Sequence, residues 1–385
     1  MNSSASQPRS TRSPASSVSS GAPSSHPLAR YGWNADIAAA FEPYEAEGLV
    51  PARIARVDRG RCEAVTAEGT VRAGIAPVAD PDPTRTVCTG DWAALRGTGG
   101  PPEVGALLPR RTAFLRSTAT TRSEGQVLAA NVDHALIAVP LAVELDLARV
   151  ERFVALAWTS GAQPLLVLTK ADLVDGQDTL AQLAADIEAS APGVTVLTVS
   201  AATGDGLEVL SAVIGGGTCV LLGSSGAGKS TLANALLGET VQDVRTTRDS
   251  DGKGRHTTTT RDLLPLPGAS GGVLIDTPGL RGVGLWDAQD GVSRTFAEIE
   301  ALAGRCRFHD CRHEAEPDCA VLSAVEDGTL PHRRLESCRK LLRENARLAA
   351  RSDARLRAER KQHFKQMSAL GRHMAERKRG GRNQP

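Results

Sequence analysis

The hydrophobic and polar positions between Leu49 and Leu115 alternate in short runs, which Gly, Pro and Asp separate. A period of two places every second side chain on one face, as in a half-buried β-strand. The runs read VPARIARV, RCEAVTA, TVRAGI, TVCTGDWAALRG and EVGALLP. Five short strands at this spacing predict a small β-barrel over residues 48–115, and the oligonucleotide-binding (OB) fold is the leading candidate.

From residue 120 to residue 287 the pattern changes to short apolar runs that alternate with helical segments. Residues 145–161 repeat their apolar positions at the helical period, with Val150 and Val154 on one side. The apolar runs that predict buried strands are 133–139, 164–168, 194–199, 218–222 and 272–275. This alternation predicts an α/β domain over 120–287, in which helices cover both faces of a mostly parallel sheet.

The two ends of the chain have compositions of their own. Residues 1–30 are rich in Ser, Pro and Gly and contain no acidic residue. We predict a disordered tail there, and an organellar transit peptide is the alternative. Residues 288–385 carry clustered cysteines and then a basic stretch, so we predict a mainly helical third domain. Because no apolar run reaches the roughly 18 residues of a membrane helix, we expect no membrane association.

The net charge of +1 conceals a strongly basic C-terminal segment. Residues 339–382 contain 15 Lys or Arg and four Asp or Glu, so their local net charge is +11. Arginines recur there at every fourth position, at Arg339, Arg343, Arg347, Arg351 and Arg355. A guanidinium stripe along a helix favours contact with a nucleic-acid phosphate backbone, and a solvated helix face is the alternative.

A glycine-rich loop follows the apolar run TCVLL and precedes the helical run KSTLANALLG. Its sequence GSSGAGKS fits G-x-x-x-x-G-K-S/T, the phosphate-binding loop of nucleotide hydrolases, at every fixed position. Lys229 is expected to reach the β- and γ-phosphates, and the Ser230 hydroxyl to bind Mg²⁺. The residues expected to contact the nucleotide are Gly223, Ser224, Ser225, Gly226, Ala227, Gly228, Lys229, Ser230 and Thr231.

Two later segments complete a predicted hydrolytic site. Residues 252–263 (GKGRHTTTTRDL) have the composition of a loop that closes over a γ-phosphate. Thr258 or Thr259 is expected to bind Mg²⁺ there. Asp276 ends an apolar run as the first residue of D-T-P-G, which suits a carboxylate near Mg²⁺, and the Gly279 backbone N–H is expected to meet the γ-phosphate.

The hydrolytic machinery itself has few candidates. Leu280 stands where many GTPases carry a glutamine that orients water, so we expect slow intrinsic hydrolysis. His256, next to the loop threonines, is the best internal candidate to position water. A solvated surface histidine is the alternative.

Two motifs that suit guanine come earlier in the chain than the phosphate loop. Thr169, Lys170, Ala171 and Asp172 fit N/T-K-x-D, and they directly follow the apolar run PLLVL. An aspartate carboxylate can accept hydrogen bonds from the guanine N1–H and amino group, which adenine lacks at that edge. The motif S-A-A follows the run VTVLTV, and a backbone N–H at Ser200 or Ala201 is expected to meet the guanine O6. Both motifs follow predicted parallel strands, where ligands of open α/β sheets bind.

The order of these motifs is unusual. Ordinary GTPases run from the phosphate loop to the switch loop, D-x-x-G, N-K-x-D and S-A-x. Here T-K-A-D at 169 and S-A-A at 200 precede the phosphate loop at 223, so we predict a circularly permuted GTPase. The switch region then leads directly into the C-terminal domain, and GTP hydrolysis is expected to move that domain as a lever.

A cysteine and histidine cluster predicts a structural metal site. Cys306, Cys311, His313 and Cys319 lie within 14 residues, and three cysteines with one histidine form a common zinc ligand set. Four protein ligands leave no open position for catalysis. His309 is the competing imidazole.

Together these features resemble the family of small-ribosomal-subunit biogenesis GTPases, the RsgA family. The resemblance covers residues 48–370 and includes LLPRRTAFLR, GRHTTTTRDL, D-T-P-G-L and the Cys/Cys/His/Cys set. It implies an OB domain, a permuted GTPase domain and a C-terminal zinc domain. It also implies a cytoplasmic protein that hydrolyses GTP with Mg²⁺, stimulated by the 30S subunit, during late maturation of that subunit. We expect a monomer that contacts 16S rRNA.

Two other functions remain open from the sequence. One is a non-ribosomal RNA-binding regulator that uses the nucleotide only as a switch. The other is an ATP-dependent enzyme, because the phosphate loop alone does not select the base. The chain departs from the usual GTPase pattern at Thr169, where many GTPases have Asn. This exchange is expected to weaken the link between the T-K-A-D motif and the phosphate loop.

Overall fold

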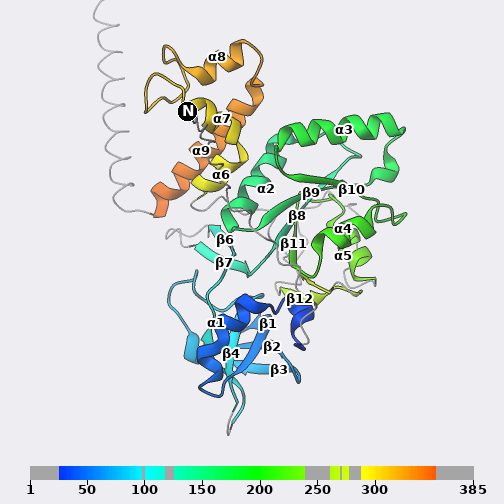
Figure 1. Ribbon diagram of the computed structural model, residues 1–385, viewed down its shortest axis with the longest axis vertical. Helices are drawn as coiled ribbons and strands as arrows, with labels where there is room; N and C mark the ends of the chain where they lie inside the picture. Colours follow the sequence, from blue (N-terminus) through cyan, green and yellow to red (C-terminus); the bar gives the residue numbers. More distant parts are fainter. Residues whose placement is uncertain are drawn as a thin grey trace, which may run out of the picture.

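The protein is described by a computed structural model, which covers residues 26–97, 100–117, 125–238, 261–268, 271–276 and 288–352. Figure 1 shows three units in a row: a β-barrel at one end, an α/β sheet in the middle and a helical unit at the other end. No helix in these ranges is both long and apolar enough to cross a membrane.

The N-terminal unit is a closed barrel of five strands, as the alternating pattern predicts. Its strands are β1 (Val50–Asp58), β2 (Arg61–Thr66), β3 (Gly69–Gly74), β4 (Trp92–Arg96) and β5 (Glu103–Leu107). They follow the order β1-β2-β3-β5-β4, and antiparallel pairing of β1 with β4 closes the barrel. This order is that of an OB fold. Alternate side chains, among them Ile54, Ala64 and Val104, fill the barrel interior.

The disordered tail predicted for residues 1–30 extends too far at its C-terminal end. Leu28 has no exposed surface and lies in a cluster with Phe41 and Trp92. The short helix η1 (Ala29–Tyr31) follows, and then the helix α1 (Ala35–Glu45). Trp33 contacts the Trp92 ring edge-on, with centroids 5.2 Å apart. These apolar side chains cover the outside of the barrel, so residues 26–30 are part of the folded unit, and residues 1–25 lie outside the described ranges.

The central unit is a six-stranded sheet in the order β10-β9-β8-β11-β13-β12. Its strands are β8 (His134–Pro140), β9 (Gln163–Thr169), β10 (Thr195–Thr198), β11 (Thr218–Leu222), β12 (Asp262–Pro265) and β13 (Val273–Asp276). Every pairing is parallel except that of β12 with β13. The five predicted apolar runs form the parallel strands, and β12 adds an antiparallel edge that the pattern does not predict.

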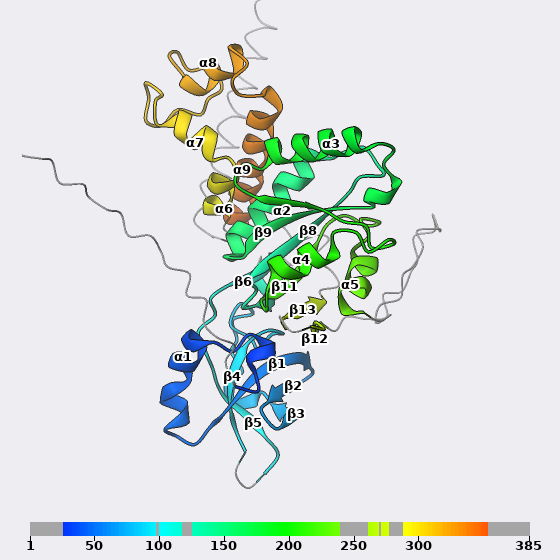
Figure 2. The ribbon, with the colours of Figure 1, turned by 45° about the vertical axis from the view of Figure 1, so that its right-hand side comes forward.

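Helices cover both faces of this sheet, as predicted. They are α2 (Leu147–Ser160), η3 (Ala171–Leu173), α3 (Gln177–Ser190), α4 (Leu207–Ile214) and α5 (Lys229–Leu237). On β8, Ile137 packs with the α2 and α3 side chains, whereas Leu136 packs with those of α4 and α5. Figure 2 shows α2 and α3 on one side of the sheet and α4 and α5 on the other.

A two-stranded hairpin joins the barrel to the sheet. It consists of β6 (Ala113–Ser117) and β7 (Gly125–Ala130), which pair in antiparallel fashion. At this junction the Arg53 side chain of β1 is 1% exposed and donates to the Thr218 hydroxyl of β11. The barrel and the sheet are therefore joined by buried contacts.

The C-terminal unit is helical, as predicted. Its helices are α6 (Gln289–Thr295), α7 (Ala297–Ala303), α8 (Ala320–Glu326) and α9 (His332–Ser352). Val292, Phe296 and Leu335 belong to the same apolar cluster as α2, so this unit packs directly on the α/β sheet domain. Of the predicted arginine stripe, Arg343 and Arg347 are exposed and Arg339 is half-buried. The side chains of Arg351 and Arg355 lie outside the described residues.

Candidate functional site

The phosphate-loop sequence leaves the carboxyl end of β11 and enters α5 at Lys229. Gly223, Gly226 and Gly228 have φ angles of 140°, 78° and 81°, which are unfavourable for other residues. A Cβ atom on Gly223 would lie 2.7 Å from the Ala138 carbonyl oxygen, so only glycine fits beside β8. The Lys229 ammonium donates to the carbonyls of Gly223 (2.9 Å) and Ser224. The lysine thus folds back over the loop.

The T-K-A-D motif lies against this loop although the two are 58 residues apart in the chain. The Thr169 hydroxyl, in a side chain that is only 4% exposed, donates to the Ala227 carbonyl at 2.8 Å. The Thr169 hydroxyl therefore makes the link to the phosphate loop directly, and a weaker link than asparagine would make stays a prediction. The next residue, Lys170, has a left-handed backbone with φ of 62°, and this turn starts η3.

The two motifs that suit guanine meet at the ends of β9 and β10. The Ser200 hydroxyl donates to Asp172 Oδ1 at 2.6 Å, and the Ala171 N–H donates to the Val199 carbonyl at 3.3 Å. The Ser200 N–H donates to the Asp205 carbonyl at 2.9 Å, so the N–H of Ala201 is the better candidate for a base contact. The structure therefore gathers T-K-A-D, S-A-A and the phosphate loop at one edge of the sheet.

The remaining predicted hydrolytic residues are divided between described and undescribed parts of the chain. Asp276 ends β13, whose Ile275 pairs with Val220 of β11, so it lies beside the strand that enters the phosphate loop. His256, Thr258, Thr259 and Gly279 lie outside the described residues.

The four predicted metal ligands lie together. The ligand atoms of Cys306, Cys311, His313 and Cys319 are all within 4.8 Å of one another, and His309 is not among them. The sulfurs of Cys306 and Cys319 are 3.8 Å apart, which matches the roughly 3.8 Å between two sulfurs of a tetrahedral zinc site. Burial lowers the pKa of His313, which favours the neutral imidazole that binds metals. The donor set and its geometry fit a structural Cys₃His centre.

A buried group of charges, which the sequence pattern does not predict, attaches α9 to the α/β domain. Arg334, 3% exposed, donates to the fully buried Glu151 of α2 at 2.9 Å and to the Ser190 carbonyl of α3 at 2.8 Å. Arg334 also pairs with Glu298, and Arg333 donates to Glu151 at 2.7 Å. We call Arg333, Arg334, Glu151 and Glu298 the α9 clamp. Its only sequence signal is a pair of arginines before an apolar position, because the partners lie far away in the chain.

Comparisons with known proteins agree with this arrangement. A family model described as RsgA GTPase matches residues 107–286. The small ribosomal subunit biogenesis GTPase RsgA of Streptomyces coelicolor is 65% identical over 92% of this chain and 96% of its own length. The protein of the same name from Opitutus terrae is 43% identical over 86% of this chain and 94% of its own length.

Solved structures share the fold. YjeQ from Thermotoga maritima superposes with a TM-score of 0.56 at 24% identity, over 77% of this chain and 98% of its own. YloQ, a circularly permuted GTPase, gives a TM-score of 0.55 at 22% identity, over 77% of this chain and 95% of its own. The family match, the extensive identity and the permuted fold show that this chain belongs to the RsgA family of GTPases.

Proposed function

We propose that this protein binds the 30S ribosomal subunit and hydrolyses GTP during late maturation of that subunit, and that the subunit stimulates turnover. One observation supports the proposal that the protein binds GTP. Thr169 bonds to Ala227, which brings the guanine-reading motif onto the phosphate loop despite the reversed order of the two in the chain. The names of the relatives support the ribosomal part.

In this proposal each motif has a distinct role toward GTP. The Asp172 carboxylate accepts from the guanine N1–H and amino group, the Lys170 stem covers the base, and the Ala201 N–H donates to O6. Lys229 leaves its loop carbonyls for the β- and γ-phosphates, which carry a larger negative charge. The Ser230 hydroxyl and Asp276 would hold Mg²⁺, which offsets phosphate charge when bound.

The hydrolytic step is assigned to residues outside the described ranges. We propose that Thr258 or Thr259 binds Mg²⁺, that the Gly279 N–H contacts the γ-phosphate, and that His256 positions the attacking water. Because Leu280 offers no group to orient water, the 30S subunit is expected to order or complete this step.

The other two units are proposed to supply ribosome contact. The OB barrel and the exposed Arg343 and Arg347 on α9 would face 16S rRNA, mainly through charge. We propose 48–115, 120–287 and 288–385 as the three domains, with residues 26–47 packed on the first of them. We also propose that the protein acts as a cytoplasmic monomer.

The most direct experiment measures GTP turnover with and without purified 30S subunits. We expect turnover to rise at least about tenfold with subunits at low salt, and less at high salt because surface charges are screened. Turnover that is unaffected by 30S subunits would favour the non-ribosomal regulator. Tighter wild-type binding of ATP than of GTP would favour the ATP-dependent enzyme.

The link between the base motif and the phosphate loop can be tested by Thr169→Val, which keeps the side-chain shape. The variant leaves the Ala227 carbonyl without its buried donor, so we expect GTP affinity to fall about tenfold. Fluorescence titration with a labelled GTP analogue measures it. Thr195→Val, on the exposed end of edge strand β10, is the matched control and should bind normally. Equal affinity in both variants would contradict the role of the link.

The metal centre is proposed to hold one structural zinc ion. Cys311→Ser should reduce bound zinc from about one ion per chain to nearly none, because three ligands hold zinc much more weakly than four. Elemental analysis measures the zinc, and circular dichroism should show earlier melting of the C-terminal unit. The control is Cys62→Ser, which changes a cysteine in the barrel core. This variant should still bind about one zinc ion per chain. A Cys311→Ser protein with full zinc content would exclude this ligand set.

A further inference from the structure

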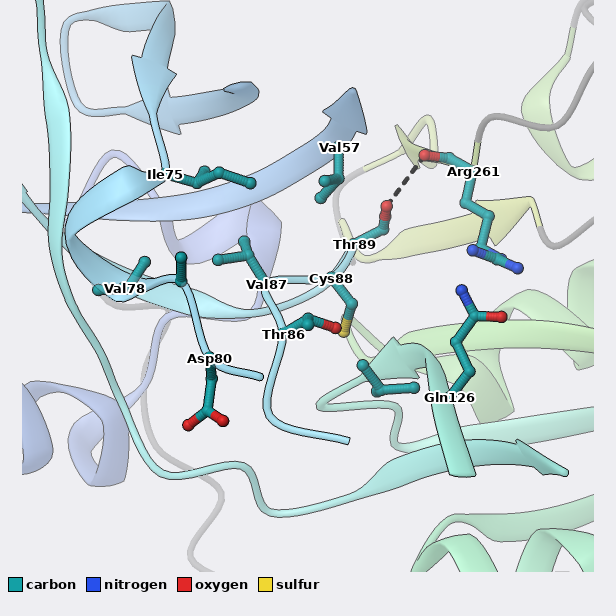
Figure 3. Close-up of a pocket in the computed structure, with 12 residues that line it drawn as sticks. Val57, Ile75, Val78, Asp80, Thr86, Val87, Cys88, Thr89, Gln126 and Arg261 are labelled. Atoms are coloured by element: carbon teal, nitrogen blue, oxygen red, sulfur yellow. Dashed lines mark hydrogen bonds between the residues drawn. The ribbon is translucent and has the colours of Figure 1, made fainter. Parts of the chain in front are cut away.

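A cavity of about 350 Å³ lies where the barrel meets the α/β domain. We call it the junction cavity. Its walls come from the barrel, from β7 and from Arg261, which directly precedes β12 (Figure 3). Small-molecule sites start at about 300 Å³ and often lie between domains.

Half of the lining residues are aliphatic, and the other half carry polar groups or a thiol. The aliphatic side chains are Val57, Ile75, Val78, Ala79, Val87 and Val127. No aromatic ring is among the lining residues that the structure describes, and these offer no stacking platform for a nucleobase. An aliphatic body is the better match.

One end of the junction cavity carries the Arg261 guanidinium, and that of Arg116 lies near it. Arg261 Nε is buried and has no hydrogen-bond partner among the described residues. Burial and the neighbouring Arg116 guanidinium lower the pKa of Arg261, so a second cation faces it. Arg116 itself donates to Gln126 Oε1 at 3.3 Å. Figure 3 shows Gln126 beside Arg261, while Asp80, the one carboxylate among the described lining residues, lies on the far side.

We propose that the junction cavity binds a small organic anion, whose aliphatic body lies against the valines and whose carboxylate or phosphate pairs with Arg261. The guanidinium fork matches both oxyanions. A buried donor without a partner is costly, and a bound oxyanion would satisfy it while offsetting the repulsion from Arg116.

Arg261 lies at the contact between the barrel and the sheet, so an anion bound to it would affect that contact. Its carbonyl accepts from the Thr89 hydroxyl of the barrel at 3.0 Å, and the adjacent Asp262 pairs with Arg56 of β1 at 3.4 Å. The residue that would hold the anion is thus already part of the barrel–sheet contact. A bound anion would stabilise this junction against separation of the two units.

The experiment uses the full-length protein and two probes, hexanoate and butyl phosphate, titrated by calorimetry at constant ionic strength. We expect saturable one-to-one binding of at least one probe, and an increase in melting temperature with it. Arg261→Gln should weaken binding at least about tenfold, because it removes the charge but keeps much of the length. Val78→Phe, which fills the cavity, should also weaken it. Arg72→Gln, an exposed arginine on β3, is the control and should bind normally.

The two probes identify the oxyanion: preference for hexanoate indicates a carboxylate, and preference for butyl phosphate indicates a phosphate. The proposal is overturned if neither probe saturates, or if Arg261→Gln and Val78→Phe both bind as the wild type does. GTP binding is measured on Val78→Phe, because Val78 belongs to the short helix η2 (Ala76–Val78) of the barrel and not to the nucleotide site. It should stay within about twofold of wild type, so loss of anion binding is distinguishable from failure of the nucleotide site.

Discussion

Asp172→Asn is expected to weaken GTP binding by about 100- to 10,000-fold while creating affinity for xanthosine triphosphate. The carboxylate would accept two hydrogen bonds from guanine, and hydrogen bonds to charged groups contribute about 1.5–3 kcal/mol each. The asparagine amide turns one acceptor into a donor, which faces the guanine amino group. Xanthine carries a carbonyl at that position, so the new donor finds an acceptor there.

The exchange should leave the local structure intact. The Ser200 hydroxyl donates to Asp172 Oδ1 at 2.6 Å, and an asparagine carbonyl can accept the same bond. Titrations with GTP, ATP and xanthosine triphosphate measure the change in specificity. Asp175→Asn, an exposed carboxylate three residues later, should bind like the wild type. If Asp172→Asn binds GTP as tightly as the wild type, the guanine assignment fails.

The parts that could be predicted from the sequence depend on short-range patterns. A buried parallel strand followed by a glycine-rich turn and a helix is a local pattern, and GSSGAGKS on β11 and α5 follows it closely. The Cys306–Cys319 cluster is local as well, since all four ligands lie within one short segment. The meeting of Thr169 and Ala227 follows from these patterns, because parallel strands of one sheet end at the same edge and only β8 lies between β9 and β11.

The parts that could not be predicted depend on distant partners or on weak patterns. Leu28 looks like one apolar residue at the end of a polar tail, and only the barrel surface around Trp92 explains its burial. The β6–β7 hairpin and β12 are short, and their apolar content does not distinguish them from loops. Arg334 lies in the run HRRLESCRKLLR, which has the composition of a solvated helix. Its burial depends on Glu151, which lies 183 residues earlier in the chain.

The α9 clamp leads to the second large expected effect. Arg334→Met should lower the free energy of unfolding by about 3–5 kcal/mol, because it leaves the fully buried Glu151 carboxylate with Arg333 alone. Glu151 Oε2 already has no hydrogen-bond partner among the described residues, so the remaining charge is poorly compensated. Chemical denaturation followed by circular dichroism measures the loss. Restoring neutrality with Glu151→Leu in the same chain should recover part of it.

An exposed ion pair provides the control for this prediction. Arg307 and Asp318 are 62% and 67% exposed, so Arg307→Met should cost less than about 1 kcal/mol. If Arg334→Met is as stable as Arg307→Met, the α9 clamp contributes nothing to stability.

The α9 clamp also restricts the movement of the C-terminal domain that the permuted motif order predicts on GTP hydrolysis. It attaches α9 to α2 and α3, so rotation of the C-terminal unit alone would have to break a buried ion pair. We therefore expect the C-terminal unit to move together with α2, and Arg334→Met to be the variant that separates the two.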